Sequence, residues 1–411
     1  MKLLVVTNGI LCLAVFAFPF SVAAANVGLG AALALGIVSG IWWQGAQRCW
    51  NNFRQLTFIF CIYFVLLILG MLWSQNPEWG IHILGRHWFW LLIPILIASL
   101  AEEKWRRYFL ISLSVGLALN LLFCVLQSFG YVHVTTGGSN AENATGHIGH
   151  IGFGFVYGIW AAWLLHLGLL WSGKQRFIVW ALAVWSYVMI FSAQGRSGYL
   201  IAVVLMLSVC LKWVLNLRSW RIAQMFVVMF VLMLLVIALG PGKERLHGTW
   251  LAFTQTEHET LYQQDSSDNA ILATKERFHM WKISLDIYRE NPVLGVGTGG
   301  FPDATAKLKP GGRPASQFTF AHPHNQYLLA LVRWGPLGLV LFSTLLFFWM
   351  REGWRRDWHE LITTPLIFLP ALAIAMHALS SSSFEGHFSG ILAALLLGVG
   401  LSAQSMSGKE S

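Results

Sequence analysis

The segment AHPHNQYLLALVRWGPLGLVLFSTLLFFWM (residues 321–350) passes from a polar stretch with two histidines into a long apolar run. A helix needs about 20 mostly apolar residues to cross the ~30 Å hydrocarbon core of a bilayer. The run over 325–350 meets that requirement, although it contains Arg333. A charge is costly in hydrocarbon, so we expect Arg333 to face protein or a water-filled cavity. The segment predicts a membrane-spanning helix with His324 at one end.

The whole chain has the composition of a multi-pass membrane protein. Its 411 residues are 56% hydrophobic and 11% charged, with a mean hydropathy of +0.61, whereas soluble domains carry about 25% charged residues. We therefore predict an all-α integral membrane protein with about 12 transmembrane helices. The candidate runs lie at about 3–19, 24–43, 56–72, 83–100, 108–129, 150–171, 177–193, 197–215, 223–240, 325–350, 361–379 and 389–404.

Basic residues in the short loops predict the orientation of these helices. A cytoplasmic N-terminus places more than half of the 27 Lys and Arg residues on the cytoplasmic side. Lys/Arg bias in short loops sets membrane topology, so we expect both termini in the cytoplasm. The net charge of +9 is then a topology signal and does not indicate a nucleic-acid partner. The basic residues on that side are Lys2, Arg48, Arg54, Lys104, Arg106, Arg107, Lys174, Arg176, Lys212, Arg218, Arg221, Arg351, Arg355, Arg356 and Lys409.

The predicted spans divide the chain into three parts. Residues 1–240 form helices one to nine, residues 241–323 form one long external loop, and residues 324–411 form the last three helices. Within the first part, residues 1–25 resemble a signal peptide, but we expect an uncleaved first helix.

Two regions of the long loop differ in character. Residues 254–272 are polar and predict a flexible segment, whereas about 274–291 predicts a helix. The predicted helix has apolar residues at 278, 281, 285 and 288, Thr274 as its N-cap, and Asn291-Pro292 at its end. We expect this helix to lie on the outer surface of the membrane.

The sequence GVGTGG (295–300) fits the pattern G-x-G-x-x-G. No strand precedes it and Pro302 follows it, so a dinucleotide-binding fold is excluded. A flexible turn and a backbone nest near a phosphate both remain open.

Several charged residues are predicted to share the external face: Arg86, Arg196, Arg277, Arg333 and His324. Each arginine alone could be a helix anchor or a solvated charge. Together they suit an anionic lipid head group, because guanidinium groups bind phosphate oxygens in pairs. A neutral histidine beside them could take a proton from a hydroxyl.

Metal and disulfide chemistry have weak support in the sequence. The pairs His147/His150 and His322/His324 have metal-ligand spacing, but no acidic ligand adjoins 322–324 and the HExxH motif is absent. The five cysteines fall in predicted spans or on the cytoplasmic side. We expect no metal, no cofactor and no disulfide framework.

The segment 321–350 resembles a family signature. His324-Asn325, nine residues, Gly335, two residues and Gly338 resemble the motif of the O-antigen ligase and polymerase superfamily, also called Wzy-C. Upstream, Arg196-Ser197-Gly198 resembles the R-x-G element of that family, and the helix with Arg277, followed by NPVLGVGTGGF, resembles the segment before its histidine. The loop SSSFEGHF (381–388) lies where the family has a short polar loop.

The resemblance implies a metal-independent, inverting glycosyltransferase of the GT-C type in the bacterial inner membrane, with its active site in the periplasm. The donor would be a glycan on undecaprenyl pyrophosphate, and the acceptor would be a lipid A-core sugar. His324 would be the general base, and Arg196 and Arg277 would hold the donor pyrophosphate. Supporting roles are expected for Arg86, Arg333, Asn325 and His322, with Asn325 as a helix cap and Gly335 and Gly338 permitting close helix packing. Arg333 could bind phosphate or pair with an acid.

Several functions remain open at this point. An O-antigen ligase fits the length and the single long loop best. A polymerase and a protein O-oligosaccharyltransferase share the donor and the motif, although members that modify proteins tend to have extra C-terminal sequence. A transporter is the alternative outside this family, but no internal repeat is visible and the charges gather on one face.

Overall fold

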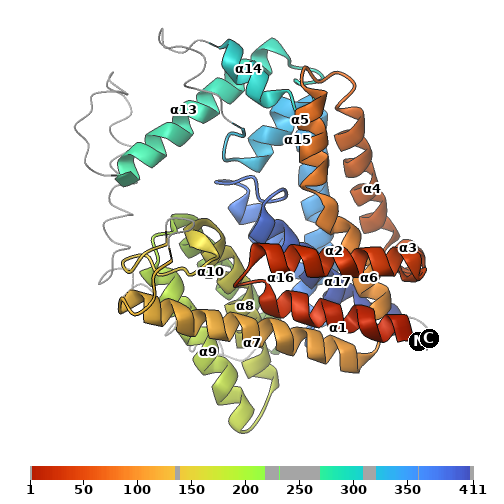
Figure 1. Ribbon diagram of the computed structural model, residues 1–411, viewed down its shortest axis with the longest axis vertical. Helices are drawn as coiled ribbons and strands as arrows, with labels where there is room; N and C mark the ends of the chain where they lie inside the picture. Colours follow the sequence, from red (N-terminus) through yellow and green to blue (C-terminus); the bar gives the residue numbers. More distant parts are fainter. Residues whose placement is uncertain are drawn as a thin grey trace.

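The computed structural model describes residues 2–134, 139–217, 231, 269–308, 321–359 and 361–407. The regular structure of these residues is helical, which confirms the all-α part of the prediction for this part of the chain (Figure 1). In chain order the helices are α1 (Lys2–Ala17), α2 (Val22–Val38), α3 (Ile41–Asn52), α4 (Arg54–Leu69), α5 (Pro77–Gly85), η1 (Trp88–Leu91), α6 (Leu92–Ser99), α7 (Glu103–Ser128), α8 (Gly149–Leu170), α9 (Lys174–Ser192), α10 (Arg196–Leu217), α13 (Asn269–Glu290), α14 (Phe301–Lys307), α15 (Gln326–Trp354), α16 (Pro365–His377) and α17 (His387–Ser407).

The protein is a multi-pass membrane protein. Among the described residues, 5 helices are long and apolar enough to cross a bilayer, or up to 7 if each of two bent pairs counts as one span. The five are α7, α8, α9, α10 and α15, and α1, α4, α16 and α17 are shorter apolar helices. Each predicted run falls on helical structure except 223–240, of which only residue 231 is described. The total of about 12 spans stays a prediction.

Two predicted runs are not straight helices. The run at 24–43 contains an 85° bend between α2 and α3, where Gly40 has a φ of 75°. This left-handed conformation is open to glycine and interrupts the helix. The run at 83–100 is bent by 45° between α5 and α6. Apolar composition alone predicted continuous spans, because it does not report backbone conformation.

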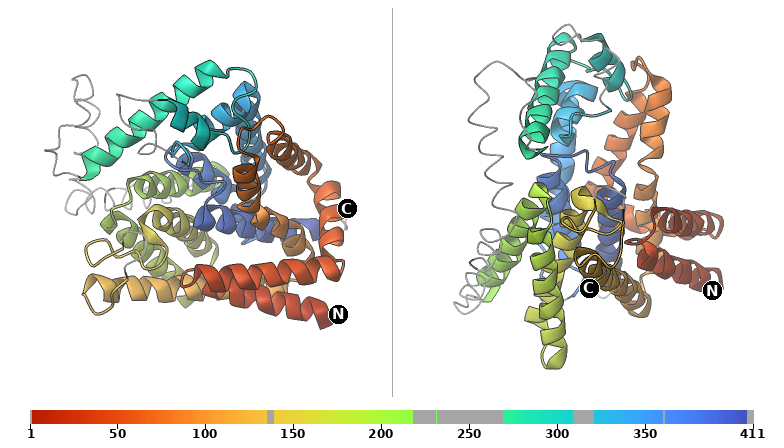
Figure 2. Two further views of the ribbon diagram at one scale, coloured as in Figure 1. Left: turned by 45° about the horizontal axis from the view of Figure 1, so that its top comes forward. Right: turned by 60° about the vertical axis from the view of Figure 1, so that its left-hand side comes forward.

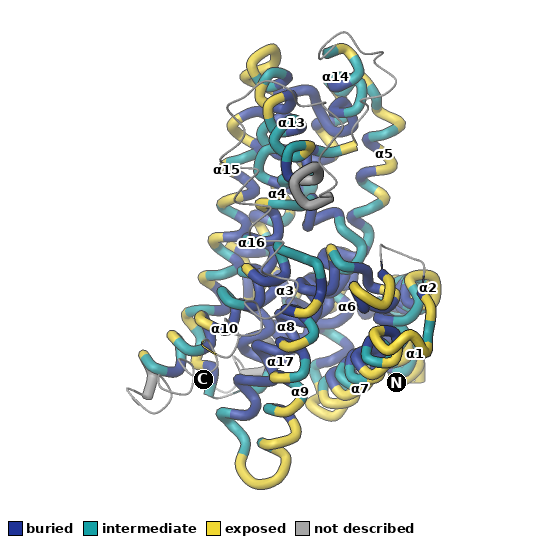
Figure 3. Tube along the Cα trace, turned by 90° about the vertical axis from the view of Figure 1, so that its left-hand side faces the viewer, coloured by how far each residue is buried: buried dark blue, intermediate teal, exposed yellow. Residues whose placement is uncertain are grey.

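Helix α8 lies at the centre of the part that would occupy the membrane. It is buried on nearly all sides and packs against α9, α10 and α16 (Figure 3). A Cβ atom added to Gly154 of α8 would lie 2.1 Å from the Cα atom of Gly198 in α10. Two glycines therefore allow these helices to approach closely, as is common between membrane helices. This contact fixes the position of the α10 N-terminus.

The helices of the long loop cover one end of the molecule. α13 and α14 lie at the end of α15 (Figures 1 and 2), and α13 packs against α15. A small apolar cluster joins them, and it includes Ile283 and Ile287 of α13 with Leu329 and Val332 of α15.

The predicted helix in this loop was correct in kind but wrong in two details. α13 begins at Asn269, so Thr274 lies inside the helix and is not its cap, and 269–272 is helical where a flexible segment was expected. The remainder of the polar stretch, 254–268, lies outside the described residues. The end before Asn291-Pro292 is confirmed.

The buried side of α13 also differs from the prediction. Met280, Ile283 and Ile287 are buried, whereas Leu285 of the predicted stripe is 41% exposed. The helix packs on α15 through Ile283 and Ile287. The side with Arg277 and Trp281 therefore faces the segment before α15.

Candidate active site at the start of α15

His324 lies just before α15 in a strained backbone conformation. Its φ is 51°, and among the described residues it is the one non-glycine with a positive φ. Such a conformation costs about 1–3 kcal/mol and persists where the surroundings enforce it. Asn325 is the N-cap, as predicted, and accepts from the N–H of Leu328 at 3.0 Å. The next N–H, of Gln326, donates to Ala378 O at 2.8 Å. These contacts fix the backbone on the C-terminal side of His324.

One face of α13 connects His324 with the arginines. Thr274, Arg277 and Trp281 are three and four residues apart, which places them along one side of the helix. Arg196 donates from Nη1 to Thr274 Oγ1 at 2.7 Å. At the other end of this face, Trp281 donates from Nε1 to Pro323 O at 3.0 Å. The face therefore runs from Arg196 to the residue that precedes His324.

Arg277 lies between these two contacts and acts on His324. Burial lowers the pKa of His324 first, and the positive charge of Arg277 lowers it further. The imidazole is therefore neutral near pH 7 and can accept a proton. One face of α13 thus connects Arg196 with Arg277 and His324, which lie far apart in the sequence.

His322 is in direct contact with His324. The two rings are 4.4 Å apart between centroids in an edge-to-face arrangement, and His322 Nδ1 accepts from the backbone N–H of His324 at 3.3 Å. Burial lowers the pKa of His322 to about 4, with the charges of His324, Arg333 and Arg86 acting in the same direction. His322 is therefore a neutral acceptor that helps to hold the backbone of its neighbour.

Arg333 is buried and paired with an acid that the sequence reading did not select. Its guanidinium contacts both carboxylate oxygens of Glu385, with Nη2 3.3 Å from Oε2. The two side chains are only 2% and 3% exposed. Burial raises the pKa of Glu385, but Arg333, His87 and Arg86 together bring it down to about 2. Of the two roles considered for Arg333, the structure places it in an ion pair.

Arg86 and His87 border this ion pair. Arg86 is the C-cap residue of α5, and its charge acts on both His322 and Glu385. His87 is buried and its Nδ1 lies 2.8 Å from Ile83 O. The predicted site residues thus form two adjoining groups, one around Arg277 and one around Glu385, and the pair His322 and His324 lies between them.

Residues 177–343 match a family model described as O-antigen ligase. This segment is similar to the O-antigen ligase family. An uncharacterized protein of Haemophilus influenzae is 28% identical over 136 residues, which are 31% of this chain and 33% of that protein. The match therefore spans about a third of the relative's length. The O-antigen ligase segment contains Arg196, Arg277 and His324, whereas Arg86 and Glu385 lie outside it.

The GVGTGG turn of the O-antigen ligase segment has a structural role. α15 is broken at Trp334 and Gly335, and the loop repairs the break, because Val296 N–H donates to Val332 O at 2.9 Å and Gly297 N–H donates to Arg333 O at 2.8 Å. The predicted turn is present, but residues 295–300 are buried and hydrogen-bonded to α15. A phosphate nest would need N–H groups that these carbonyls already use.

The two motif glycines have distinct reasons to be glycine. Gly335 has a φ of 65°, and a Cβ there would lie 2.0 Å from Val293 O. A Cβ on Gly338 would lie 2.4 Å from Ala330 O. Gly335 thus lies at the break of α15, where the loop with Val296 and Gly297 packs. The sequence predicted only that this glycine permits close helix packing.

Metal-ligating side chains do not cluster in the described part of the chain. No group of three or more His, Cys, Asp or Glu side chains there is placed to hold a metal ion. The five cysteines are free thiols in this structure.

Proposed function

We propose that this protein is an O-antigen ligase of the bacterial inner membrane. It transfers a glycan from undecaprenyl pyrophosphate to a sugar hydroxyl of lipid A-core at the periplasmic face. The observation that carries the proposal is the strained His324 beside the face of α13 that holds Arg277 and contacts Arg196. Strained backbone conformations cluster at active sites, and the match to the O-antigen ligase family covers all three residues.

The chemistry assigned to these residues is a single displacement at the anomeric carbon of the donor. The neutral imidazole of His324 takes the proton of the acceptor hydroxyl as its oxygen attacks that carbon. The bond between the carbon and the pyrophosphate oxygen breaks, and undecaprenyl pyrophosphate leaves with the bonding electrons. Attack from the opposite side inverts the configuration.

The arginines act on the leaving group. Arg196 and Arg277 stay charged at any working pH and present two N–H donors each to a pyrophosphate. They stabilise the negative charge that develops there as the glycosidic bond breaks. In this scheme two guanidinium groups supply the charge that a metal ion supplies in other transferases, so the reaction is metal-independent.

The neighbouring residues position this machinery. Asn325 caps α15 and His322 holds the backbone of His324. The ion pair of Arg333 and Glu385 connects α15 to the loop before α17, and the positive charge of Arg86 acts on His322 and Glu385. The Lys/Arg bias of the short loops predicts that both termini lie in the cytoplasm. With this orientation, the whole group of residues lies on the periplasmic side.

A gene deletion with lipopolysaccharide gel analysis tests the proposed function. A ligase deletion keeps long glycan on the lipid carrier and leaves lipid A-core without O-antigen. A polymerase deletion still attaches a single repeat to lipid A-core, and a protein glycan transferase deletion leaves the lipopolysaccharide unchanged. Either of the last two patterns contradicts the assignment as a ligase.

Complementation of the deletion assigns the role of the histidine. The intact gene restores O-antigen, and we expect His324→Ala not to restore it while the protein is present in the membrane at normal amount. His82→Ala is the matched control, since His82 is an exposed histidine of the same predicted face and its loss leaves transfer intact.

A further inference from the structure

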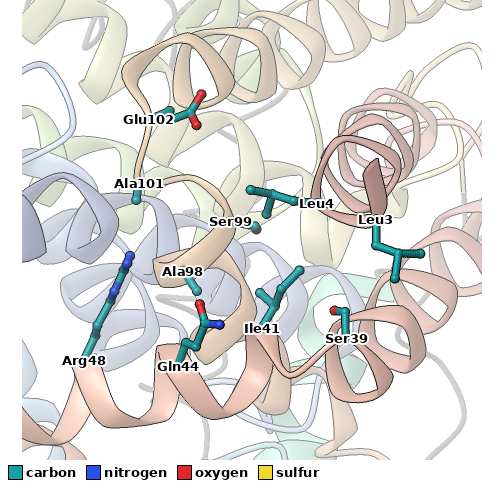
Figure 4. A pocket seen from close by; sticks show the side chains of 10 residues that line it. All are labelled: Leu3, Leu4, Ser39, Ile41, Gln44, Arg48, Ala98, Ser99, Ala101 and Glu102. Atoms are coloured by element: carbon teal, nitrogen blue, oxygen red, sulfur yellow. The ribbon is translucent and has the colours of Figure 1, made fainter. Parts of the chain in front are cut away.

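A cavity of about 460 Å³, lined by none of the candidate site residues, lies among the ends of several helices (Figure 4). It is bounded by the start of α1, the bend between α2 and α3, and the connection from α6 to α7. This volume is within the range of small-molecule sites. Its polar lining residues are Ser39, Gln44, Arg48, Ser99 and Glu102. The cavity has no part in the proposed transfer reaction.

Two opposite charges line this cavity without pairing. Within the described part of the chain, neither Arg48 nor Glu102 forms an ion pair, although both line the same space. The hydrogen bond of Arg48 is a long one, 3.5 Å from Nη1 to Ile97 O. Glu102 precedes α7, but its side chain does not cap that helix. A ligand that satisfies both side chains must carry a negative and a positive group.

The surroundings of the cavity have the character of a membrane–water interface. α3 follows the 85° bend and combines tryptophans with polar residues, as helices that lie in the interface do. Trp43 and Trp50 of α3 are 63% and 44% exposed, and interfacial tryptophans gather at the level of lipid head groups. Lys104 and Arg107 follow at the start of α7, on the face that the Lys/Arg bias predicts to be cytoplasmic.

We propose that this cavity binds the head group of a zwitterionic phospholipid with a primary ammonium, of the phosphatidylethanolamine type. Arg48 and Gln44 donate to the phosphate oxygens, and the carboxylate of Glu102 accepts from the ammonium group. Figure 4 shows Arg48 and Gln44 extending from α3 toward the segment from Ala98 to Ala101, which Glu102 follows. The apolar lining residues Leu3 and Ile41 face the same space and contact the glycerol end of the lipid.

Native mass spectrometry of the purified, full-length protein tests this proposal. The protein is delipidated in detergent and mixed with equal amounts of phosphatidylethanolamine, phosphatidylglycerol and phosphatidylcholine of the same acyl chains. We expect the retained lipid to be phosphatidylethanolamine. Phosphatidylglycerol lacks the cation, and phosphatidylcholine has the cation but no N–H to donate. Equal retention of the three lipids, or preference for either of the others, overturns the proposal.

Two variants assign the contacts. Arg48→Ala removes a charge-assisted phosphate contact, so retention of phosphatidylethanolamine falls by about tenfold or more. Glu102→Gln removes the ammonium acceptor, so the preference over phosphatidylcholine and phosphatidylglycerol disappears. Size-exclusion profiles and melting temperatures verify that each variant is folded.

The matched controls are neighbours outside the cavity. Glu103→Gln changes the next carboxylate, which pairs with Arg107 on the surface, and Arg54→Ala removes a cation that lies over the ring of Trp50. Both controls retain phosphatidylethanolamine like the unmodified protein. Loss of binding in the controls equal to that in the cavity variants contradicts a defined site, as does full retention by Arg48→Ala.

Discussion

The direction of the His324 side chain is set by its backbone. A φ of 51° costs free energy for a residue with a Cβ, and the neighbours on both sides hold it: Trp281 binds Pro323 O, and Asn325 caps α15. A general base gains from this arrangement, since the imidazole does not have to be ordered when the acceptor binds. The strain is therefore consistent with the catalytic role proposed for His324.

The rate of transfer should depend on pH through His324. Its pKa is lowered by burial and by Arg277, and a base must be unprotonated to act. Transfer should therefore stay at its plateau at pH 7 and fall as the pH drops through the lowered pKa, with a midpoint below the ordinary value of ~6.5. The pH profile of kcat/KM measures this midpoint, and a midpoint above 6.5 contradicts the assignment.

Arg277 can be tested through the same profile. Arg277→Gln removes the charge that lowers the pKa of His324, so the midpoint of the residual activity moves up. Arg277→Lys keeps the charge and loses the forked donor, so the rate falls by about tenfold or more while the midpoint stays in place. A structural role alone would not separate the two variants in this way. Full activity of Arg277→Lys argues against paired donors at the pyrophosphate.

The break in α15 joins three elements. The GVGTGG loop donates to the carbonyls of Val332 and Arg333 that the break exposes, and the side chain of Arg333 reaches Glu385 before α17. Backbone groups of a membrane span must find partners within the protein, and this loop supplies those partners where α15 breaks. The position of Arg333 thus depends on a glycine turn about forty residues earlier in the sequence.

Gly335→Ala tests the importance of the break. Gly335 has a φ of 65° and a ψ of −161°, a region open almost only to glycine, so alanine there costs about 1–3 kcal/mol, and its Cβ would collide with Val293 O. We expect a lower melting temperature in detergent and loss of transfer. Gly85→Ala is a control, because a Cβ there meets no atom within 4 Å. A Gly335→Ala protein with unchanged melting temperature contradicts the arrangement of loop and helix described above.

The Arg333–Glu385 pair makes a separate prediction. Glu385→Gln leaves a buried guanidinium without its counter-charge, and the expected loss of stability is about 3–5 kcal/mol. The double variant Arg333→Met, Glu385→Leu removes both charges, so stability returns to a large extent. Thermal unfolding of the three proteins measures these differences. A double variant less stable than Glu385→Gln would contradict the view that the loss of stability in Glu385→Gln comes from the unpaired charge of Arg333.

The sequence predicted the helical class and most helix positions of the described chain, because the apolar runs are long and continuous. It did not predict the bend at Gly40, which depends on backbone conformation. The buried residues of α13 lie two positions further along the chain than the predicted stripe, because apolar residues occur on both sides of the helix and only one side packs on α15. The prediction failed where packing against another element determines which side of a helix is buried.

The sequence also predicted some residues of the candidate site and missed another. His324, Arg196 and Arg277 could be selected from short patterns in the sequence, and in the structure all three adjoin one face of α13. Glu385 was missed, because its importance comes from a contact with Arg333 that lies 52 residues away in the chain. The signal that could have found it is its position as the acidic residue of the loop SSSFEGHF, opposite an arginine in a membrane helix that needs a counter-charge.

Transfer by the purified protein is the most direct test of the whole account. The protein is reconstituted in vesicles with a glycan on undecaprenyl pyrophosphate and with lipid A-core, in the presence of EDTA, and glycosylated lipid A-core is quantified. The unmodified protein should form this product, and His324→Ala should form at least about a hundredfold less. Product formation by His324→Ala at the unmodified rate would contradict the central role given to His324, and transfer that requires an added metal ion would contradict the arginine-based mechanism.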